Sequence, residues 1–510
     1  MKTTSGKVFL IGAGPGDPGL ITVRGRDCIA AADVVVYDYL AAPALLRHAR
    51  SGAEMIYVGK KGGDHTLSQE GINALLVEKA GAGHTVARLK GGDPYIFGRG
   101  GEEAEALVDA GVPFEVVPGV TSGVAAAAYA GIPLTHRDHT TAVAFVTGHE
   151  DPNKAESTID WPALARGVGT LVFFMGVGNL PKIVDQLVQN GRDPETPVAL
   201  IRWGTTPKQV TVSGALSDIV EKVRAAGLKA PAITVVGGVV GLRERLGWFE
   251  KRPLLGRRVV VTRARHQASE LVERLAALGA DTLECPTIQV VPPSDWTALD
   301  EALAALAAYD WIIFTSVNGV RFFFERLFET GRDVRALGRT RTAAIGPATA
   351  DRLKNFGLNT DILPDSYRAE SVVEAFEGVD LKNRRVLIPR AAEARPILPA
   401  ELVRRGAVVD EIPVYHTVQA RDGVDDLHAG LAEGSLDMVT FTSSSTVRNF
   451  RALFPPDAEP KEFLKGVAVA SIGPITSDTA RELGFPVDVE AESYTIPGLV
   501  SAIAAHFGPR

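Results

Sequence analysis

The chain has 510 residues, of which 45% are hydrophobic and 23% charged, and its formal net charge is −7. At about 150 residues per domain, this length corresponds to three or four compact units. The composition excludes a disordered, collagen-like or coiled-coil chain, and the acidic balance argues against a general nucleic-acid binder.

The cysteine content and the lack of long apolar runs in the sequence narrow the expected cellular location and the possible kinds of site. Cys28 and Cys285 are the two cysteines, too few for a disulfide framework or a four-ligand zinc site. We therefore expect a reducing, cytoplasmic location and no metal. The first residues lack the pattern of a signal peptide, and no stretch of about 18 apolar residues runs uninterrupted, so we expect no membrane segment.

Short β-branched runs alternate with helical patterns through the first half. The expected strands occupy 8–12, 32–38, 54–59, 85–93, 114–119, 142–148, 170–176, 197–204 and 233–238. Strands that alternate with helices at this spacing predict βαβ units, an α/β fold and mainly parallel sheets. In such folds the functional loops follow the carboxyl ends of the strands.

The first glycine-rich loop, GAGPGD at 12–17, follows a strand and invites comparison with the dinucleotide-binding fingerprint. The third glycine comes one position early, Pro15 removes an amide, and Asp17 places a negative charge where a phosphate would lie. Asp38 lies near the distance expected for a ribose-binding acid. A dehydrogenase therefore stays open as a weak alternative.

A longer glycine cluster, LKGGDPYIFGRGGEE, occupies 89–103. A Gly-Gly-Asp turn after a strand lets the backbone approach a ligand closely, and its carboxylate can accept hydrogen bonds from an amino group or from hydroxyls. This pattern favours a cationic ligand with an amino-acid head over a polyphosphate. As an isolated motif it is simply a turn.

The pattern breaks in a basic segment containing proline and glycine at 247–258, before a new strand at 259–265. We place a linker at 248–256. Beyond it the sequence repeats with a period of 127, so that Thr315 corresponds to Thr442, Gly346 to Gly473 and Thr349 to Thr476. Residues 257–383 and 384–510 are thus two copies of one α/β unit, expected to face one another across a cleft, unless the duplication serves folding alone.

The order of motifs in residues 5–250 resembles the tetrapyrrole methylase family, and within it the S-adenosylmethionine-dependent uroporphyrinogen-III C-methyltransferases. The resemblance is strongest in LKGGDPYIFGRGGEE and GIPLTHRD (131–138). It implies two lobes, about 1–118 and 119–247, a homodimer, and transfer of two methyl groups to carbons 2 and 7 of uroporphyrinogen III, giving precorrin-2. The implied S-adenosylmethionine site comprises Pro15, Gly91, Gly92, Asp93, Ile96, Thr121, Ser122, Met175, Gly204 and, more weakly, Thr234.

The same resemblance implies Asp38 as general base and Lys60 as general acid. Methyl transfer is an in-line displacement that depends mainly on positioning, and the methylated macrocycle must then lose a proton to a base. The alternatives are a turn-capping role for Asp38 and a solvated surface position for Lys60. Because the substrate is a polycarboxylate, the nearby cations Lys61, Arg99 and Arg137 are candidate substrate-binding residues.

Residues 257–510 resemble the uroporphyrinogen-III synthases through FTSVNGV, AIGPATA, VLIPRA, PVYHTV, FTSSSTVRNF and SIGPITSDTA. The resemblance implies one lobe formed by about 257–289 plus 417–510, another by about 290–416, and a two-stranded connection at 288–292 and 415–418. The implied reaction cyclises hydroxymethylbilane with loss of water and inversion of the last ring.

Guiding a reactive bilane is a problem of positioning, which hydroxyls and helix amides can solve. Tyr415 is our candidate for assisting loss of the hydroxyl. The substrate-binding candidates are Thr315, Ser316, Asn318, Gly346, Thr349, Thr442, Ser443, Ser444, Gly473 and Thr476. The alternative for each serine or threonine is a simple helix N-cap.

We therefore predict a bifunctional enzyme with small-molecule tetrapyrrole substrates, and with no nucleic-acid or membrane partner. A later precorrin methylation is the alternative that keeps the fold. A degenerate tetrapyrrole or S-adenosylmethionine sensor is the non-enzymatic alternative.

Overall fold

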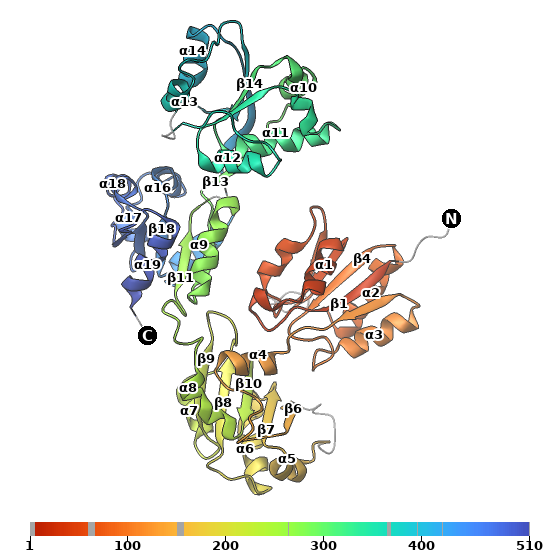
Figure 1. Cartoon of the computed structure of the whole chain (residues 1–510). Helices are drawn as coiled ribbons and strands as arrows, with labels where there is room; N and C mark the ends of the chain where they lie inside the picture. The colour runs from red at the N-terminus through yellow and green to blue at the C-terminus, as the bar shows by residue number, and fades with distance from the viewer. Residues whose placement is uncertain are drawn as a thin grey trace. The chain divides into compact units, whose positions relative to one another are not determined.

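The computed structural model describes residues 6–59, 67–149, 158–263, 265–364, 369–394, 396–420 and 422–508. The chain divides into two compact units, one formed mainly by residues up to Arg257 and the other mainly by residues from Arg258 onward. Each unit contains two five-stranded sheets with their helices (Figure 1). The predicted α/β class with mainly parallel sheets is confirmed, with one exception described below.

The first sheet has the strand order β3-β2-β4-β1-β5, and all its pairs are parallel. Alternate residues of each strand face opposite sides, so Val8 and Leu10 pack under α2 and α3 while Phe9 and Ile11 pack under α1. Its elements are β1 (Lys7–Gly12), α1 (Val23–Ala31), β2 (Val34–Tyr37), β3 (Glu54–Tyr57), α2 (Gln69–Gly81), β4 (Thr85–Lys90), α3 (Gly100–Asp109) and β5 (Phe114–Val117).

The second sheet has the order β6-β7-β10-β8-β9 and is mostly antiparallel, because only β6 and β7 run parallel. Strands β8 and β9 form a hairpin around 203–209, a segment that contains the predicted cofactor residue Gly204. Its elements are α4 (Ser122–Tyr129), β6 (Val143–Thr147), α5 (Trp161–Gly167), β7 (Thr170–Phe174), α6 (Leu180–Gln189), β8 (Pro197–Arg202), β9 (Val210–Ala215), α7 (Ile219–Ala225), β10 (Ala232–Val236) and α8 (Arg243–Leu246).

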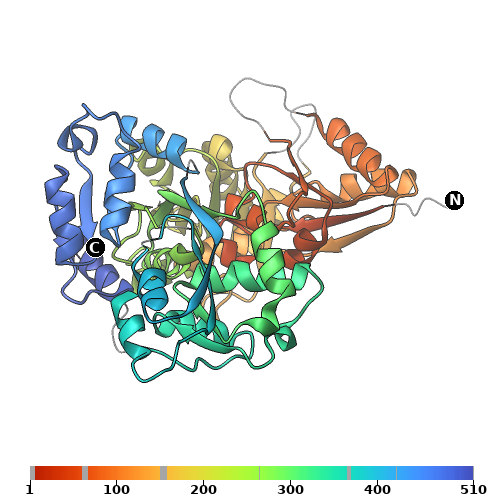
Figure 2. The same ribbon diagram turned by 90° about the horizontal axis from the view of Figure 1, so that it is seen from above.

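The third sheet, β12-β11-β18-β19-β20, combines strands from both ends of the second unit. Figure 2 shows its C-terminal part in blue, with helices beside the strands. Its elements are β11 (Arg258–Val261), α9 (Arg265–Ala277), β12 (Asp281–Glu284), α15 (Val424–Ala432), β18 (Met438–Phe441), α16 (Ser444–Arg451), α17 (Pro460–Phe463), β19 (Ala468–Ser471), α18 (Pro474–Glu482), β20 (Val489–Glu490) and α19 (Ile496–Phe507).

The fourth sheet, β13-β17-β16-β14-β15, uses the continuous segment between those two parts. Its elements are β13 (Ile288–Val291), α10 (Thr297–Ala304), β14 (Trp311–Phe314), α11 (Val317–Glu329), β15 (Arg341–Ala344), α12 (Pro347–Lys354), α13 (Ala369–Ala375), β16 (Arg385–Ala391), α14 (Ile397–Arg404) and β17 (Val408–Gln419). Strands β13 and β17 pair antiparallel, Ile288 opposite Gln419 and Val291 opposite His416, in the two segments for which a two-stranded connection is predicted.

The segment after α8 packs against the second sheet's helices instead of extending into solvent. Phe249 is buried, and its ring and that of Trp248 contact the ring of Tyr129 at the end of α4. Within the described residues, no helix is both long enough and apolar enough to cross a membrane.

Candidate active sites

Three glycine-rich loops of the first sheet touch one another through their backbones. A Cβ on Gly12 would lie 2.5 Å from the Cα of Gly119, so neither position has room for a side chain. The Gly92 amide donates to the Gly14 carbonyl at 2.7 Å, and the Gly14 amide donates to the Gly92 carbonyl at 3.2 Å. The loops after β1, β4 and β5 are therefore glycine-rich because their main chains meet at one edge of the sheet.

Asp93 is part of this loop contact. One of its carboxylate oxygens accepts a hydrogen bond from the Tyr95 amide at 2.8 Å, and the other accepts one from the Gly119 amide at 3.0 Å. The carboxylate thereby joins the loop after β4 to the loop after β5. Its predicted contact with a ligand would have to use the remaining lone pairs of these oxygens.

The loops of the second sheet reach the same region. Gly204 follows β8 and packs against α4, where a Cβ would lie 2.5 Å from the Cβ of Ala126. Met175 follows β7 with a left-handed φ of 55° and is 55% exposed. The ring of Phe174 lies 5.0 Å from that of Phe97 in the loop after β4, so side chains of the two lobes touch there.

A polar contact also joins the two lobes. The Asp17 amide donates to Thr205 Oγ1 at 3.0 Å, and the Tyr129 hydroxyl donates to Asp17 Oδ2 at 2.7 Å. Burial and the neighbouring Asp17 carboxylate raise the pKa of Tyr129. Sequence reasoning missed this contact, because nothing in the local pattern relates Asp17 to residues 112 and 188 positions away.

The predicted cofactor residues lie on these adjoining elements. The loops after β1 and β4 contain Pro15, Gly91, Gly92, Asp93 and Ile96, and α4 begins at Thr121 and Ser122. The other three are Met175 directly after β7, Gly204 in the loop after β8, and Thr234 within β10. Ile96 is exposed, and the Thr121 side chain makes no capping bond to α4. Thr234 is fully buried, and its hydroxyl has no hydrogen-bond partner among the residues described.

Asp38 lies directly after β2, and both of its carboxylate oxygens accept hydrogen bonds. Oδ1 accepts from the Leu40 amide at 3.0 Å, so the predicted turn-capping alternative describes part of its geometry. Oδ2 accepts from Arg88 Nη2 at 3.2 Å. The side chain is 21% exposed, so part of it stays accessible.

Of the predicted cations, the structure describes Arg99 and Arg137. Lys60 and Lys61 fall outside the described residues. Arg99 is exposed at the start of α3 and forms two hydrogen bonds to Glu102, at 2.9 and 2.5 Å, which lower the pKa of that carboxyl. Arg137 is exposed in the loop before β6.

In the second unit, Ser316 and Tyr415 meet although 99 positions separate them. Ser316 caps α11 by accepting from the Gly319 amide at 2.9 Å, and its Oγ lies 3.0 Å from the Tyr415 hydroxyl. Tyr415 is 8% exposed and stacks on Phe322. Burial is the largest cause that raises its pKa, while the bond to Ser316 opposes the rise.

The corresponding turn in the other copy has a different polar partner. Ser443 caps α16 through a reciprocal pair of hydrogen bonds with Thr446, and its Oγ lies 2.9 Å from that of Ser445. The repeat relates Tyr415 to Ile288, which has no hydroxyl. The two copies therefore differ in chemistry, because the turn at Ser316 has the Tyr415 hydroxyl beside it and the repeat supplies no corresponding tyrosine for the turn at Ser443.

The remaining synthase candidates lie at carboxyl ends of parallel strands, one cluster in each sheet. The adjacent strands β14 and β15 are followed by Thr315, Ser316, Asn318, Gly346 and Thr349. The adjacent strands β18 and β19 are followed by Thr442, Ser443, Ser444, Gly473 and Thr476. Thr349 and Thr476 are buried, at 3% and 5% exposure. Among the other candidates, Gly346 and Gly473 are buried, and the remaining serines, threonines and asparagine are partly exposed.

Comparison with known proteins agrees with both halves of this description. The family model for Tetrapyrrole (Corrin/Porphyrin) Methylases matches residues 7–220, and that for Uroporphyrinogen-III synthase HemD matches residues 269–501. The porphyrin biosynthesis protein HemD of Ruminiclostridium josui is 38% identical over 98% of this chain and 97% of its own length.

Two further relatives match the first half. The S-adenosyl-L-methionine-dependent uroporphyrinogen III methyltransferase of Methanosarcina barkeri is 52% identical over 48% of this chain and 97% of its own length. The crystal structure of uroporphyrin-III C-methyl transferase from Thermus thermophilus, complexed with S-adenyl homocysteine, is 41% identical over 46% of this chain and 100% of that chain, with a TM-score of 0.40. The chain thus belongs to the tetrapyrrole methylases in its first half and to the uroporphyrinogen-III synthases in its second.

Proposed function

We propose that this chain catalyses two steps on tetrapyrroles. The second half cyclises hydroxymethylbilane to uroporphyrinogen III, with loss of water and inversion of the last ring. The first half transfers two methyl groups to carbons 2 and 7 of uroporphyrinogen III and forms precorrin-2. The observation that carries the proposal is that a methylase family match and a synthase family match lie in one chain, which also aligns over almost its whole length with a relative named as a porphyrin biosynthesis protein.

The residues at the adjoining loops of the first half fit S-adenosylmethionine. The region offers exposed apolar side chains, Ile96 and Met175, and the hydroxyl of Thr121, which is not used to cap α4. Among the described residues, these loops contain no run of lysines or arginines such as a polyphosphate would need. The bound cofactor supplies an electrophilic methyl group on sulfur. The role of the protein is to hold both reactants and to exclude water.

Asp38 is the group proposed to take up the proton that the ring loses after methylation. Its side chain is partly exposed, while the Leu40 amide holds one carboxylate oxygen and Arg88 holds the other. A carboxylate fixed in this way can accept a proton without rearranging.

In the second half, Tyr415 is proposed to assist departure of the hydroxyl group from the bilane. The Ser316 Oγ accepts from the helix amide and can accept or donate toward the phenol, which orients the phenolic hydroxyl. A neutral phenol in this position can donate a hydrogen bond or a proton to a leaving oxygen. The uncharged turns at the ends of β14, β15, β18 and β19 provide amides and hydroxyls for substrate carboxylates.

Each activity can be tested on the purified full chain. With uroporphyrinogen III and S-adenosylmethionine we expect a product two methyl groups heavier. No methylated product would favour a later precorrin as substrate. With hydroxymethylbilane alone we expect the type III isomer, and formation of the type I isomer alone would contradict the synthase assignment.

We also propose that the enzyme is a cytoplasmic homodimer that associates through its methyltransferase half. This proposal rests on the family resemblance and on the cysteine content of the sequence. Sedimentation equilibrium of the full chain tests the dimer directly, and a mass equal to one chain across micromolar concentrations would contradict it.

A further inference from the structure

Strand β4 carries two positive charges into a buried face of the first sheet. Arg88 and Lys90 are two residues apart, so they point to the same side as Val86, which packs under α2 and α3. They are 3% and 4% exposed. Charged groups this deeply buried are destabilising unless they are paired and hydrogen-bonded.

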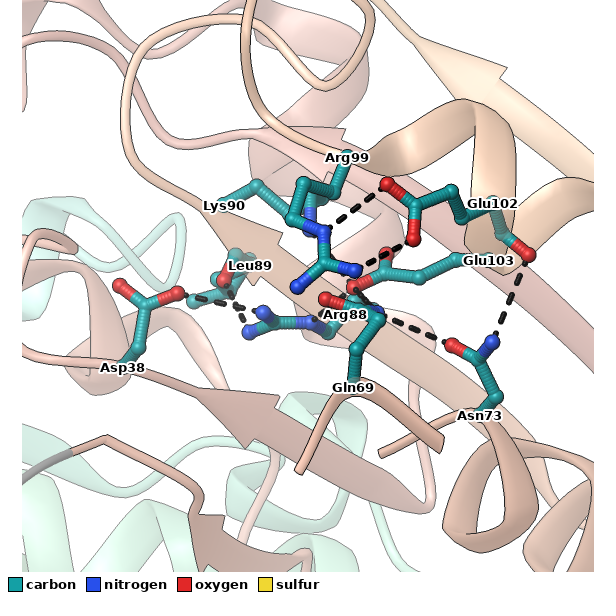
Figure 3. A network of polar contacts seen from close by, with 9 residues as sticks. All are labelled: Asp38, Gln69, Asn73, Arg88, Leu89, Lys90, Arg99, Glu102 and Glu103. Carbon is teal, nitrogen blue, oxygen red and sulfur yellow. Dashed lines mark hydrogen bonds and ion pairs between the residues drawn. The ribbon is translucent and has the colours of Figure 1, made fainter. Parts of the chain in front are cut away.

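Glu103, in the first turn of α3, pairs with both cations. Its side chain is fully buried, and its Oε1 accepts from Lys90 Nζ at 2.6 Å and from Arg88 Nε at 3.3 Å. Gln69, which begins α2, donates to the same oxygen at 3.3 Å. Figure 3 shows these side chains converging on Glu103 from β4 and α2.

The other end of Arg88 points away from Glu103 toward Asp38. Its Nη1 donates to the Leu89 carbonyl at 2.8 Å, and its Nη2 donates to Asp38 Oδ2 at 3.2 Å. The guanidinium is therefore held at three points, by Glu103, by Leu89 and by Asp38 (Figure 3). Because a guanidinium is planar and rigid, fixing two of its edges fixes the direction of the third contact.

The network is not the arrangement that stability alone would favour. Replacing buried ion pairs by apolar side chains of similar volume is often neutral or stabilising. In addition, Glu103 Oε2 is buried without a hydrogen-bond partner among the residues described, which costs desolvation energy. The network also ends at Asp38, which is partly exposed at the edge where the glycine loops meet.

We propose that Arg88 is a positioning residue for methyl transfer: anchored by Glu103, it holds the Asp38 carboxylate in one orientation toward the substrate. This inference rests on the proposed function, in which Asp38 takes up the proton from the methylated ring. Lys90 balances the second negative charge, so that Glu103 can anchor Arg88 without leaving the network with excess charge.

A double-mutant cycle on the full chain separates this role from a structural one. Arg88→Met, Asp38→Asn and the double variant are assayed for methyl transfer to uroporphyrinogen III, with the KM for S-adenosylmethionine and the melting temperature measured alongside. We expect Arg88→Met to lower kcat by about 10²-fold, the loss typical of a misplaced reacting group, with little change in KM. In the Asp38→Asn background the same change should have no further effect on kcat, because Arg88 acts through Asp38.

Two further variants keep the test decisive. Arg88→Lys retains the charge and disturbs the fold less, so it replaces Arg88→Met if that variant does not fold. We expect its kcat to lie between those of the unchanged chain and Arg88→Met. In the Asp38→Asn background, Arg88→Lys should cause no further loss of kcat. Arg192→Met is the matched control, because Arg192 in the other lobe donates to the carbonyls of Ala165, Val168 and Gly169 and touches none of these residues. It should lower the melting temperature without lowering kcat.

The outcomes distinguish the two levels of the proposal. If Asp38→Asn lowers kcat and the losses from Arg88→Met and Asp38→Asn multiply in the double variant, the positioning role is overturned while the proposed function stands. If Asp38→Asn leaves kcat unchanged, the base assignment fails and the inference fails with it. A chain that does not methylate uroporphyrinogen III at all contradicts the proposed function itself.

Discussion

The contact between Ser316 and Tyr415 is the most specific residue-level feature of the second half, and it leads to a direct prediction. Tyr415→Phe removes the hydroxyl that lies 3.0 Å from Ser316 Oγ but keeps the ring stacked on Phe322. We expect formation of the type III isomer to fall by about 10²-fold, the lower end for loss of a general acid. The rate is followed by separating the isomers at short times.

Tyr309→Phe is the matched control for this experiment. Tyr309 is also buried, but its hydroxyl donates to Asp410 at 2.6 Å, at the opposite end of the same sheet's strands. Losing a hydrogen bond to a charged group should lower the free energy of unfolding by about 2 kcal/mol while leaving the isomer ratio unchanged. An equal loss of type III product in both variants would argue that Tyr415 acts through stability.

The two cysteines give a prediction about reactivity. Burial raises the pKa of Cys28 and raises that of Cys285 to about 12, so both thiols stay protonated at pH 8. We expect no modification of the native chain by a thiol-disulfide reagent at that pH, and two modified cysteines after unfolding in guanidinium. Rapid labelling of the native chain would show that one of the thiols is accessible.

At the residue scale, the sequence predicts residue types near the site better than it predicts their partners. Asp38 and Ser316 can be singled out from the sequence, because Asp38 ends an expected strand and Ser316 recurs as Ser443 in the 127-residue repeat. The partner of each is distant in sequence: Arg88 for Asp38, and Tyr415 for Ser316. Glu103 lies inside a quoted motif, and Arg88 and Lys90 stand out as charges in an apolar strand, yet only the packing of α3 on β4 shows that they pair.

At the scale of elements, the edge where β1, β4 and β5 end depends on glycine. Gly12→Ala would place a Cβ 2.5 Å from the Gly119 backbone, which cannot move without displacing its loop. We expect a loss of about 1–3 kcal/mol of stability, as for overpacked sites, together with weaker S-adenosylmethionine binding. Calorimetry and a binding titration measure the two effects.

Gly81→Ala provides the comparison for this variant. Gly81 ends α2, and a Cβ there would meet nothing within 4 Å. Alanine should be neutral or slightly stabilising at this position because it favours helix. If both variants were equally stable, the close approach of the loops after β1 and β5 would not be needed for the fold.

The second sheet shows where prediction of elements fails. Alternating strands and helices predict parallel pairing, which the first sheet follows throughout. In the second sheet β9 follows β8 after a short turn, and a short turn can join only antiparallel strands. Strand β9 is half-exposed and has no run of apolar residues, so periodicity gives it no signal.

At the scale of the whole molecule, the two active sites draw on different residues and should be separable. Asp38→Asn should slow methylation strongly while leaving cyclisation intact, so that uroporphyrinogen III accumulates from hydroxymethylbilane even with S-adenosylmethionine present. Tyr415→Phe should slow the supply of that intermediate and leave methylation of added uroporphyrinogen III unchanged. Loss of both activities in either variant would indicate that the halves depend on one another.

The most direct test of the central claim, that one chain carries both activities, is mass spectrometry of products formed from hydroxymethylbilane by the purified full chain. Without S-adenosylmethionine we predict uroporphyrinogen III as the sole enzymatic product. With S-adenosylmethionine we predict its conversion to a species two methyl groups heavier. Unmethylated type I isomer under both conditions would contradict the account.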